Sequence, residues 1–567
     1  MKPATPSRPA ARTAKALAAM LAATVLFAPA GGAASEVSTR ASVTGGEVEG
    51  SITDGILSFR GIPFAAPPVG QLRWRPPQPV APWNDALDAR DFAPDCMQKA
   101  DRSNPNVGIP PIRTDPREDC LYLNVVRPAA PRDKPLPVMV WFFGGGFSTG
   151  GTSPTLFQGE ELAAQDVIFV SFNYRLGRLG FFGHPALSRD RPDEPKANYG
   201  FLDQIAALQW VKKNIAAFGG DPRNVTIFGE SAGAGAVEAM MISPLAEGLF
   251  QKAIIQSGAP QVFTKRELRS DQPGRLSLEK FGLAFASSKG IAGTGKSALA
   301  RLRALPATDL IDLSAGLPAE RDYSRTPWGG PTMDGRVLPV VEGDYFRNGT
   351  FRAVPLLIGS NADDITASLG ADEDRPLDYS LARFGADRDA ALRAYDPGRT
   401  GNARLIRRRI VADDHMIETA RFVGRAVEAR AAPVYRYHFG YVTEALEGRW
   451  VYGAPHGSEI AYAFNNLARY YGPALSPRDA AVGKTLSAYW VNFARTGNPN
   501  GPGLPEWPRF RAAEDLILKV HANGAFGSGP DPLKARLDLA EKVAQAERNG
   551  REPVAGAPRW PRYEPQP

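Results

Sequence analysis

The chain has 567 residues, 43% of them hydrophobic, which is enough to bury a large core in several small domains or in one large α/β domain. Its formal net charge of +7 includes four cations within the first 34 residues, which contain no Asp or Glu, so the remainder carries only +3. The remaining cations are interleaved with acids, as where three arginines at 407–409 precede Asp413 and Asp414. Such interleaving is typical of a solvated surface, so we expect no nucleic-acid partner.

Residues 1–34 have the layout of a secretory signal peptide. Basic residues precede an apolar run from Ala16 to Ala28, and small residues follow through Ala34. An amphipathic arm is the alternative. The run is too short for a stable membrane anchor, and no later stretch approaches the ~18 apolar residues that a membrane helix needs. We therefore expect a secreted or periplasmic protein whose mature chain has no integral membrane segment.

The rest of the chain is predicted to form one domain over residues 35–540. No repeat with a period of roughly 20 to 50 residues and no low-complexity linker divides it. Residues 541–567 are predicted to form a loosely ordered C-terminal tail, whose last part, residues 551–567, is rich in Pro and Arg.

The chain contains two cysteines, Cys96 and Cys120. An even pair in an exported chain is more typical of a disulfide than of a metal site, which would need further ligands nearby. Two buried thiols are the alternative. A disulfide that closes a loop of this length without strain stabilises the fold by roughly 3 kcal/mol.

Five apolar, β-branched runs bounded by Gly, Asp or Asn indicate strands of a buried parallel sheet. In chain order these runs are residues 138–143, 167–172, 225–228, 253–256 and 354–359. Helical periodicity is clearest over residues 199–217, where Phe201, Ile205, Leu208 and Ile215 share one helical face. Strands that alternate with helices predict a doubly wound α/β sheet.

Two serines, Ser148 and Ser231, lie in a Gly-x-Ser-x-Gly pattern, which alone carries little weight in a chain with 57 glycines. A nucleophilic serine of this type occupies a sharp turn between a strand and a helix, whose N-terminus faces the developing oxyanion. Ser231 follows the strand-like residues 224–228 and precedes small residues, 232–241, which can form a closely packed helix. Ser148 runs into Gly-Gly-Thr-Ser-Pro, which cannot start a helix. We therefore predict that Ser231 is the nucleophile and Ser148 a loop residue.

An acyl-transfer site also needs preset N–H donors for the tetrahedral oxyanion. Gly144, Gly145 and Gly146, after the first of the five predicted strands, can supply them, because glycine lets the backbone approach a substrate closely. The N–H of Ala232 would complete such an oxyanion hole. A plain flexible loop is the alternative for the three glycines.

With these features in place, the sequence resembles the type-B carboxylesterase/cholinesterase family over most of residues 36–510. The likeness rests on several long strings, which are Phe59 to Gly70, Leu72 to Trp74, Glu118 to Val125, Asn198 to Gln204, Phe218 to Asn224, Trp490 to Phe493 and Gly497 to Asn500. The resemblance implies an α/β-hydrolase fold, with a large, mostly parallel central sheet flanked by helices. It makes residues 35–540 a carboxylesterase catalytic domain.

The resemblance also implies specific pairings and donors. It matches Cys96 and Cys120 to a disulfide of the family, and it assigns the oxyanion hole to Gly145, Gly146 and Ala232.

The same resemblance supplies the acid and the base that accompany Ser231, in the chain order Ser, acid, His. The family's catalytic Glu falls on Asp364, and its catalytic His falls on His456. Because Asp364 is one methylene shorter than the family's Glu, Asp363 is the alternative acid.

The setting of His456 among five histidines supports the same choice. It lies in a loop flanked by Gly and Pro, which can present a side chain at a sheet edge. His184 and His438 are predicted to be structural, and His415 is predicted to lie on a helix surface. No role is predicted for His521.

Two further features concern the surroundings of the site. Phe143 stands where many family members carry His before the three glycines, so any hydrogen bond of that His is missing. The N–H donors remain, and we expect activity to survive. Glu230 and Ser257 match positions that line or support the family's gorge, where they either tune the electrostatics around His456 or serve as structural polar residues.

The sequence thus predicts a serine carboxylesterase that acts on a small-molecule ester through a Ser-His-Asp triad and an acyl-enzyme. No metal and no organic cofactor is expected, because no cluster of His and Cys has metal-ligand spacing. The alternatives are hydrolysis of an amide, carbamate or polyester at the same site, or a non-catalytic binding protein with the same fold.

Overall fold

The computed structural model describes residues 37–99, 111–258, 266–272, 275–318, 328–339, 342–364, 369, 373–472 and 475–548. The predicted signal peptide and residues 549–567 of the predicted tail therefore lie outside the described residues. The described residues from Ser38 on belong to one compact unit. Within these ranges no helix is both long enough and apolar enough to cross a membrane.

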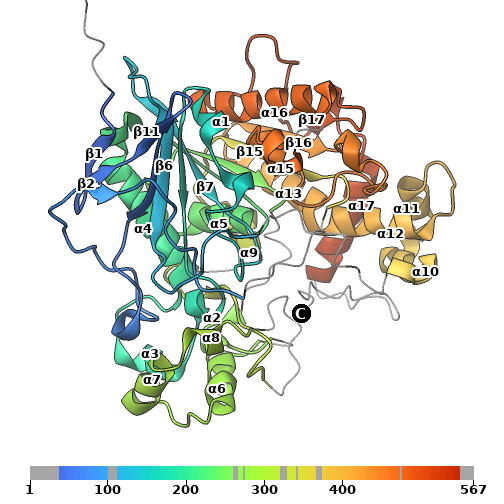
Figure 1. Cartoon of the computed structure of the whole chain (residues 1–567). Coiled ribbons are helices and arrows are strands. Elements are labelled where there is room, and N and C mark those ends of the chain that lie inside the picture. Colours follow the sequence, from blue (N-terminus) through green and yellow to red (C-terminus); the bar gives the residue numbers. More distant parts are fainter. Residues whose placement is uncertain are drawn as a thin grey trace, which may run out of the picture. The chain divides into compact units, whose positions relative to one another are not determined.

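An 11-stranded sheet runs through this unit in the order β18-β17-β16-β15-β12-β11-β7-β8-β6-β4-β3. Figure 1 labels several of its strands, including β6, β7, β11, β15, β16 and β17. Its strands are β3 (Ser51–Thr53), β4 (Ile56–Pro63), β6 (Tyr122–Pro128), β7 (Leu136–Phe142), β8 (Ile168–Phe172), β11 (Gly220–Glu230), β12 (Lys252–Gln256), β15 (Leu356–Asn361), β16 (Val434–Phe439), β17 (Leu516–Val520) and β18 (Phe526–Pro530). The sheet is parallel from β8 to β17 and antiparallel at both ends. All five predicted strands belong to its parallel part.

Shorter strands lie outside this sheet. They are β1 (Arg40–Val43), β2 (Gly46–Glu49), β5 (Leu87–Asp88), β9 (Phe181–Phe182), β10 (Ala197–Asn198), β13 (Arg266–Glu267) and β14 (Thr332–Met333). The helices are α1 (Glu160–Ala163), α2 (Gly177–Gly180), α3 (Pro185–Asp190), α4 (Tyr199–Asn214), α5 (Ala232–Ile242), α6 (Leu278–Ser288), α7 (Lys296–Arg303), α8 (Ala307–Leu310), α9 (Glu342–Asn348), α10 (Leu377–Leu381), α11 (Arg388–Tyr395), α12 (Ala403–Ala412), α13 (Glu418–Glu428), α14 (Ile460–Ala463), α15 (Leu467–Tyr471), α16 (Pro477–Thr496) and α17 (Lys534–Arg548).

Helices cover the parallel strands, which explains why those strands are apolar along their whole length. Helix α5 packs against β11 and β12, α16 against β7 and β11, and α13 against β15 and β16 (Figure 1). The predicted helix over residues 199–217 is α4, continued by a 3₁₀ turn that ends at Gly219 with φ of 82°. The arrangement confirms the predicted α/β-hydrolase architecture.

Helix α17 runs across residue 540, where the tail was predicted to begin. Leu537 and Ala540 are buried, and Glu541 accepts a hydrogen bond from Arg421 of α13 at 3.0 Å. Residues 541–548 are therefore a packed helical extension of the unit.

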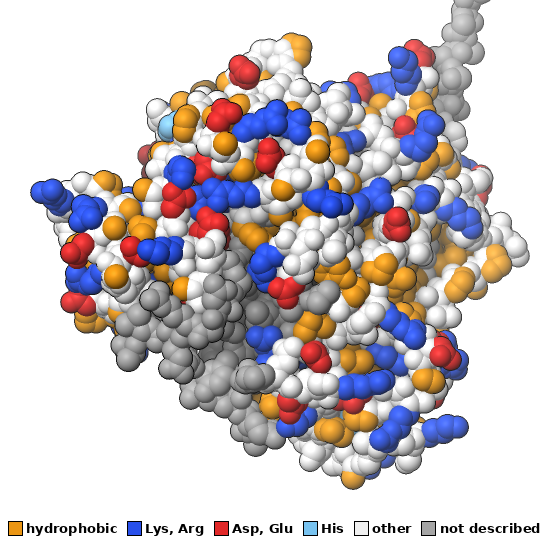
Figure 2. Space-filling view, turned by 180° about the vertical axis from the view of Figure 1, so that it is seen from behind, with side chains coloured by type: hydrophobic (Ala, Val, Ile, Leu, Met, Phe, Trp, Pro, Cys, Tyr) orange, Lys and Arg blue, Asp and Glu red, His pale blue; other side chains and the backbone are white. Residues whose placement is uncertain are grey.

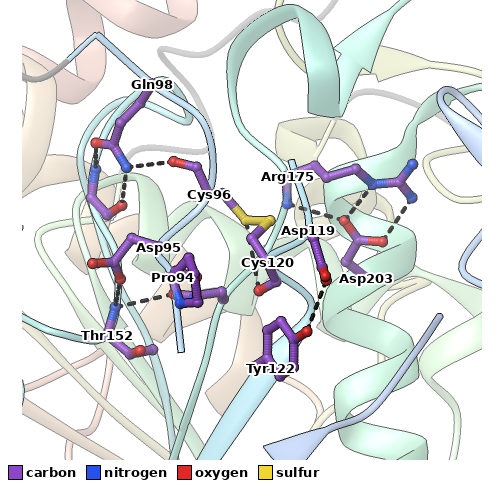
Figure 3. The surroundings of a disulfide bond; sticks show 12 residues. Pro94, Asp95, Cys96, Gln98, Asp119, Cys120, Tyr122, Thr152, Arg175 and Asp203 are labelled. Carbon is purple, nitrogen blue, oxygen red and sulfur yellow. Dashed lines mark hydrogen bonds and ion pairs between the residues drawn. A yellow bond between two sulfur atoms is a disulfide. The ribbon is translucent and has the colours of Figure 1, made fainter. Parts of the chain in front are cut away.

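Cys96 and Cys120 form a disulfide bond, and both are buried (Figure 3). Asp95 and Gln98, on either side of Cys96, form hydrogen bonds to Gly150 and Thr152, which follow the three glycines. Gln98 Oε1 accepts from the N–H of Gly150 at 2.8 Å, and its Nε2 donates to the carbonyl of Gly150 at 2.6 Å. The carboxylate of Asp95 accepts from the N–H of Thr152 at 2.9 Å. The disulfide thus supports one side of the glycine loop.

Charged side chains are mixed in sign on the face shown in Figure 2. Lys and Arg side chains lie among Asp and Glu side chains there. Arg407 and Asp413, from the stretch predicted to form a solvated surface, are instead fully buried.

Candidate active site

Ser231 occupies a sharp turn between β11 and α5. Its φ of 56° and ψ of −122° are rare for a residue with a side chain, and such strain persists only where the surroundings impose it. The Ser231 N–H donates to the carbonyl of Gln256 at the end of β12, at 3.0 Å. Its carbonyl accepts from the N–H of Gly235 in the first turn of α5, at 2.9 Å. Strand and helix together therefore fix the backbone that carries the hydroxyl.

The two glycines of the Gly-x-Ser-x-Gly pattern are required by close packing. A Cβ atom on Gly233 would lie 2.0 Å from the carbonyl oxygen of Phe142 at the end of β7. A Cβ atom on Gly229 would lie 2.6 Å from the carbonyl oxygen of Gly233. No side chain fits at these distances, so the pattern is a packing requirement of the turn as well as a signature of its chemistry.

The loop of three glycines lies against this turn. A Cβ atom on Gly144 would lie 3.2 Å from Ser231 Cβ. Gly145 and Gly146 have φ of 106° and 63°, which glycine adopts without strain. The N–H groups of Gly145 and Gly146 donate to no other described residue. Ala232 is the first residue of α5, where a helix leaves its N–H without an internal acceptor. Three N–H groups are thus available beside Ser231.

Ser148, the second serine with the same flanking pattern, has a different setting. Its N–H donates to the carbonyl of Gly145 at 3.1 Å, and its hydroxyl donates to the same oxygen at 3.3 Å. Ser148 is therefore part of the turn that shapes the glycine loop.

The loop begins at Phe143, which is fully buried. Its ring stacks on Tyr174 with a centroid distance of 4.3 Å and an interplanar angle of 17°. The Tyr174 hydroxyl donates to the carbonyl of Phe143 at 2.9 Å. Stacking and this hydrogen bond hold the start of the glycine loop without a histidine at position 143.

His456 and Asp364 form a close pair. His456 Nδ1 lies 2.5 Å from Asp364 Oδ1, and the aspartate is fully buried. Asp364 Oδ2 accepts from the Ser257 hydroxyl at 2.6 Å and from the N–H of Asn361 at 2.9 Å. The Ser257 hydroxyl and the Asn361 N–H thereby hold the carboxylate in one orientation.

Asp363 points elsewhere. It accepts from Arg408 Nε of α12 at 2.8 Å and forms an ion pair with the same guanidinium. The N–H of Asp363 donates to the carbonyl of Ala454 at 2.9 Å, which joins the acid-bearing loop to the loop that carries His456. The geometry favours Asp364 over Asp363 as the partner of His456.

Glu230, the residue before Ser231, faces the other ring nitrogen. Its Oε1 lies 3.2 Å from His456 Nε2, and its side chain is 1% exposed. Burial raises the pKa of Glu230 to about 8. Burial alone lowers the pKa of His456, but the charges of Glu230 and Asp364 outweigh it and raise the pKa to about 10. The two groups therefore titrate as a coupled pair, and the pKa of each depends on the charge of the other.

A third buried carboxylate, Glu459, lies behind this pair. Its Oε1 accepts from Gln256 Nε2 at 3.0 Å and its Oε2 from Asn361 Nδ2 at 2.5 Å. Burial raises the pKa of Glu459 above its ordinary value. The sequence alone gives no reason to select Glu459, which lies three residues after His456.

The other histidines lie in different surroundings. His184 is the N-cap of α3, where its ring accepts from the N–H of Ala186, which is a structural role. His438 is buried in β16. The prediction that His415 lies on a surface was wrong, since it is 5% exposed. Its ring Nδ1 lies 2.9 Å from the carbonyl of Val411, in a π-helical turn between α12 and α13. His521 is exposed after β17.

The described residues contain no group of three or more His, Cys, Asp and Glu side chains that could hold a metal ion.

A strained serine between a parallel strand and a helix, N–H groups beside it and a His–Asp pair from later loops have the arrangement expected of an α/β-hydrolase site. A sequence model of the carboxylesterase family matches residues 34–395 and 396–537. The chain therefore belongs to the carboxylesterase family, as its resemblance to type-B carboxylesterases and cholinesterases predicted, and it is a carboxylic ester hydrolase.

Several relatives show how the similarity extends over the chain. Fumonisin B1 esterase of Sphingopyxis macrogoltabida is 36% identical over 507 residues, covering 86% of this chain and 88% of that protein. Para-nitrobenzyl esterase of Bacillus subtilis (strain 168) is 34% identical over 487 residues, covering 83% and 93%. Acetylcholinesterase of Bungarus fasciatus is 33% identical over 512 residues, covering 83% and 80%. The solved structure of a PNB esterase superposes with a TM-score of 0.70 at 32% identity, covering 88% of this chain and 99% of that one.

Proposed function

We propose that this protein cleaves small-molecule carboxylic esters through an acyl-enzyme on Ser231, with His456 as general base and Asp364 as its orienting acid. The observation that carries the proposal is the 2.5 Å contact between His456 Nδ1 and Asp364, formed beside the strained turn of Ser231. A carboxylate on Nδ1 fixes the tautomer that leaves Nε2 able to accept a proton.

In the first half of the reaction, His456 Nε2 takes the proton of the Ser231 hydroxyl as Oγ attacks the ester carbonyl. The carbonyl oxygen becomes an oxyanion, which accepts hydrogen bonds from the N–H groups of Gly145, Gly146 and Ala232. The bond to the alcohol oxygen then breaks, His456 returns the proton to that oxygen, and the acyl group stays on Ser231.

In the second half, water attacks the acyl carbon. His456 takes the proton of the water, and the same three N–H groups hold the second oxyanion. Collapse returns the proton to Ser231 Oγ and releases the carboxylic acid. Glu230 takes no part in the proton transfers. Because its carboxylate faces His456 Nε2, it sets the pH range in which the imidazole is free to accept a proton.

Export from the cytoplasm is part of the same proposal. The signal-like layout of residues 1–34 supports it, and so does the disulfide, because disulfides persist in oxidising compartments.

Turnover of a short-chain p-nitrophenyl ester tests the proposal, with Ser231→Ala and Ser148→Ala as a matched pair. We expect Ser231→Ala to lose activity by a factor of about 10⁴ or more, and Ser148→Ala to keep most of it. An inactive but folded wild type would favour a non-catalytic binding protein. A higher kcat/KM on a matched amide than on the ester would favour an amide hydrolase.

A further inference from the structure

We propose that a cavity of about 170 Å³ between the acid-bearing loop, α12 and α17 is a binding site for a small oxyanion such as phosphate or a carboxylate. Asp363 lines the cavity, whereas the neighbouring Asp364 holds the imidazole of His456, and neither Asp364 nor His456 is among the described lining residues. It is separate from the catalytic groups, so the inference does not depend on the proposed function.

The lining has an excess of positive charge. Arg408, Arg409 and Arg536 contribute three guanidinium groups, and Asp363 is the carboxylate among the described lining residues. Arg408 already binds Asp363, and Arg536 binds Asp413 at 2.6 and 2.8 Å.

Arg409 differs from the other two arginines. Among the described residues it forms no ion pair, and its side chain donates to the carbonyl of Tyr395 at 2.8 Å. Burial and then the positive charge of Arg536 lower its pKa, and the more weakly acting charges of Asp396 and Asp413 oppose this shift. An anion in the cavity would give Arg409 a direct ionic partner, through charge-assisted hydrogen bonds.

His438 provides an independent polar group in the cavity wall. Its side chain belongs to β16, it is 6% exposed, and its Nδ1 has no hydrogen-bond partner. A buried polar atom without a partner is costly, so a ligand or water that binds it is favoured. Burial lowers the pKa of His438 to about 4, so the ring is neutral at pH 7 and donates when Nδ1 carries the proton.

The size of the cavity fits the same class of ligand. A volume of about 170 Å³ far exceeds the 10 to 15 Å³ that one water needs, yet lies below the roughly 300 Å³ at which pockets for larger organic ligands begin. Arg408 and Arg409 are only partly buried, so an ion can enter from solvent.

Thermal unfolding of the full-length protein with added inorganic phosphate tests the inference. We expect the midpoint to rise and saturate with phosphate, and to rise less with sodium chloride at the same ionic strength. Sodium acetate in a parallel titration distinguishes a preference for phosphate from a preference for carboxylate. An equal response to chloride would mean that the cavity holds only water, and would overturn the proposal.

Variants locate the effect. Arg409→Gln is expected to weaken the apparent phosphate affinity at least tenfold, whereas Arg223→Gln, at a side chain that is 88% exposed, should leave it unchanged. His438→Phe keeps a ring but removes Nδ1, so it should weaken phosphate binding at least threefold. If Arg409→Gln does not fold, His438→Phe takes its place as the test. Unchanged phosphate affinity in a folded Arg409→Gln or His438→Phe protein would contradict the site.

Discussion

Replacing Glu230 with Gln removes one negative charge 3.2 Å from His456 Nε2 and keeps the shape of the side chain. A general base must be neutral to accept a proton, and the Glu230 carboxylate favours the charged imidazole. The variant should therefore lower the pKa of His456. The acid limb of the kcat/KM profile should move to lower pH, so the variant stays active where the wild type has lost activity.

The size of the shift follows from the distance. Two unit charges 3.2 Å apart interact by roughly 5 kcal/mol at an effective dielectric constant of 20, which is a ceiling of nearly four pKa units. Because burial raises the pKa of Glu230 to about 8, the carboxylate is not fully charged near neutral pH. We therefore expect a downward shift of about one to three units.

The shift is measured from the pH profile of p-nitrophenyl ester hydrolysis between about pH 5 and 11, which brackets the raised pKa of His456. The product is detected at its isosbestic wavelength, where its absorbance does not depend on pH, and spontaneous hydrolysis is subtracted. Glu47→Gln, at a side chain that is 41% exposed on β2, controls for a general change in protein charge. An acid limb that stays in place, or moves to higher pH, would refute the electrostatic role of Glu230.

Four further variants test the geometry of the site and the contribution of the disulfide to stability. Asp364→Asn should lower kcat by about 10⁴ whereas Asp363→Asn should cost far less, which steady-state kinetics on the same ester will distinguish. Gly233→Ala should lower kcat/KM by about 10² or more, because the new Cβ would lie 2.0 Å from the carbonyl oxygen of Phe142 and must displace the turn; a fully active, folded variant would contradict this. Cys96→Ser should lower the free energy of unfolding by roughly 3 kcal/mol and the thermal midpoint with it, and an unchanged midpoint would contradict the role of the disulfide.

The parallel strands and the nucleophile turn were predictable because their signals are local. Apolar runs predicted β7, β8, β11, β12 and β15 to within a few residues. Two local features distinguished Ser231 from Ser148 as the nucleophile. They are the strand before Ser231 and the small residues after it. These features depend on neighbours in sequence, so a single chain is enough to find them.

The acid and the buried histidine were harder to predict because their settings depend on distant residues. Asp363 and Asp364 are adjacent, and Arg408 on α12 binds the first while His456 faces the second. His415 follows two aspartates, which suggested a solvated surface. Asp413 is instead fully buried against Arg536 of α17, 123 positions further along the chain, and the turn lies inside the fold.

The most direct test of the central claim is covalent labelling with a serine-directed fluorophosphonate, followed by peptide mass spectrometry. The account predicts one stoichiometric adduct on Ser231, lost in Ser231→Ala, with Ser148 unlabelled. A stoichiometric adduct on Ser148, or a fully active enzyme without an adduct on Ser231, would contradict the assignment of the nucleophile.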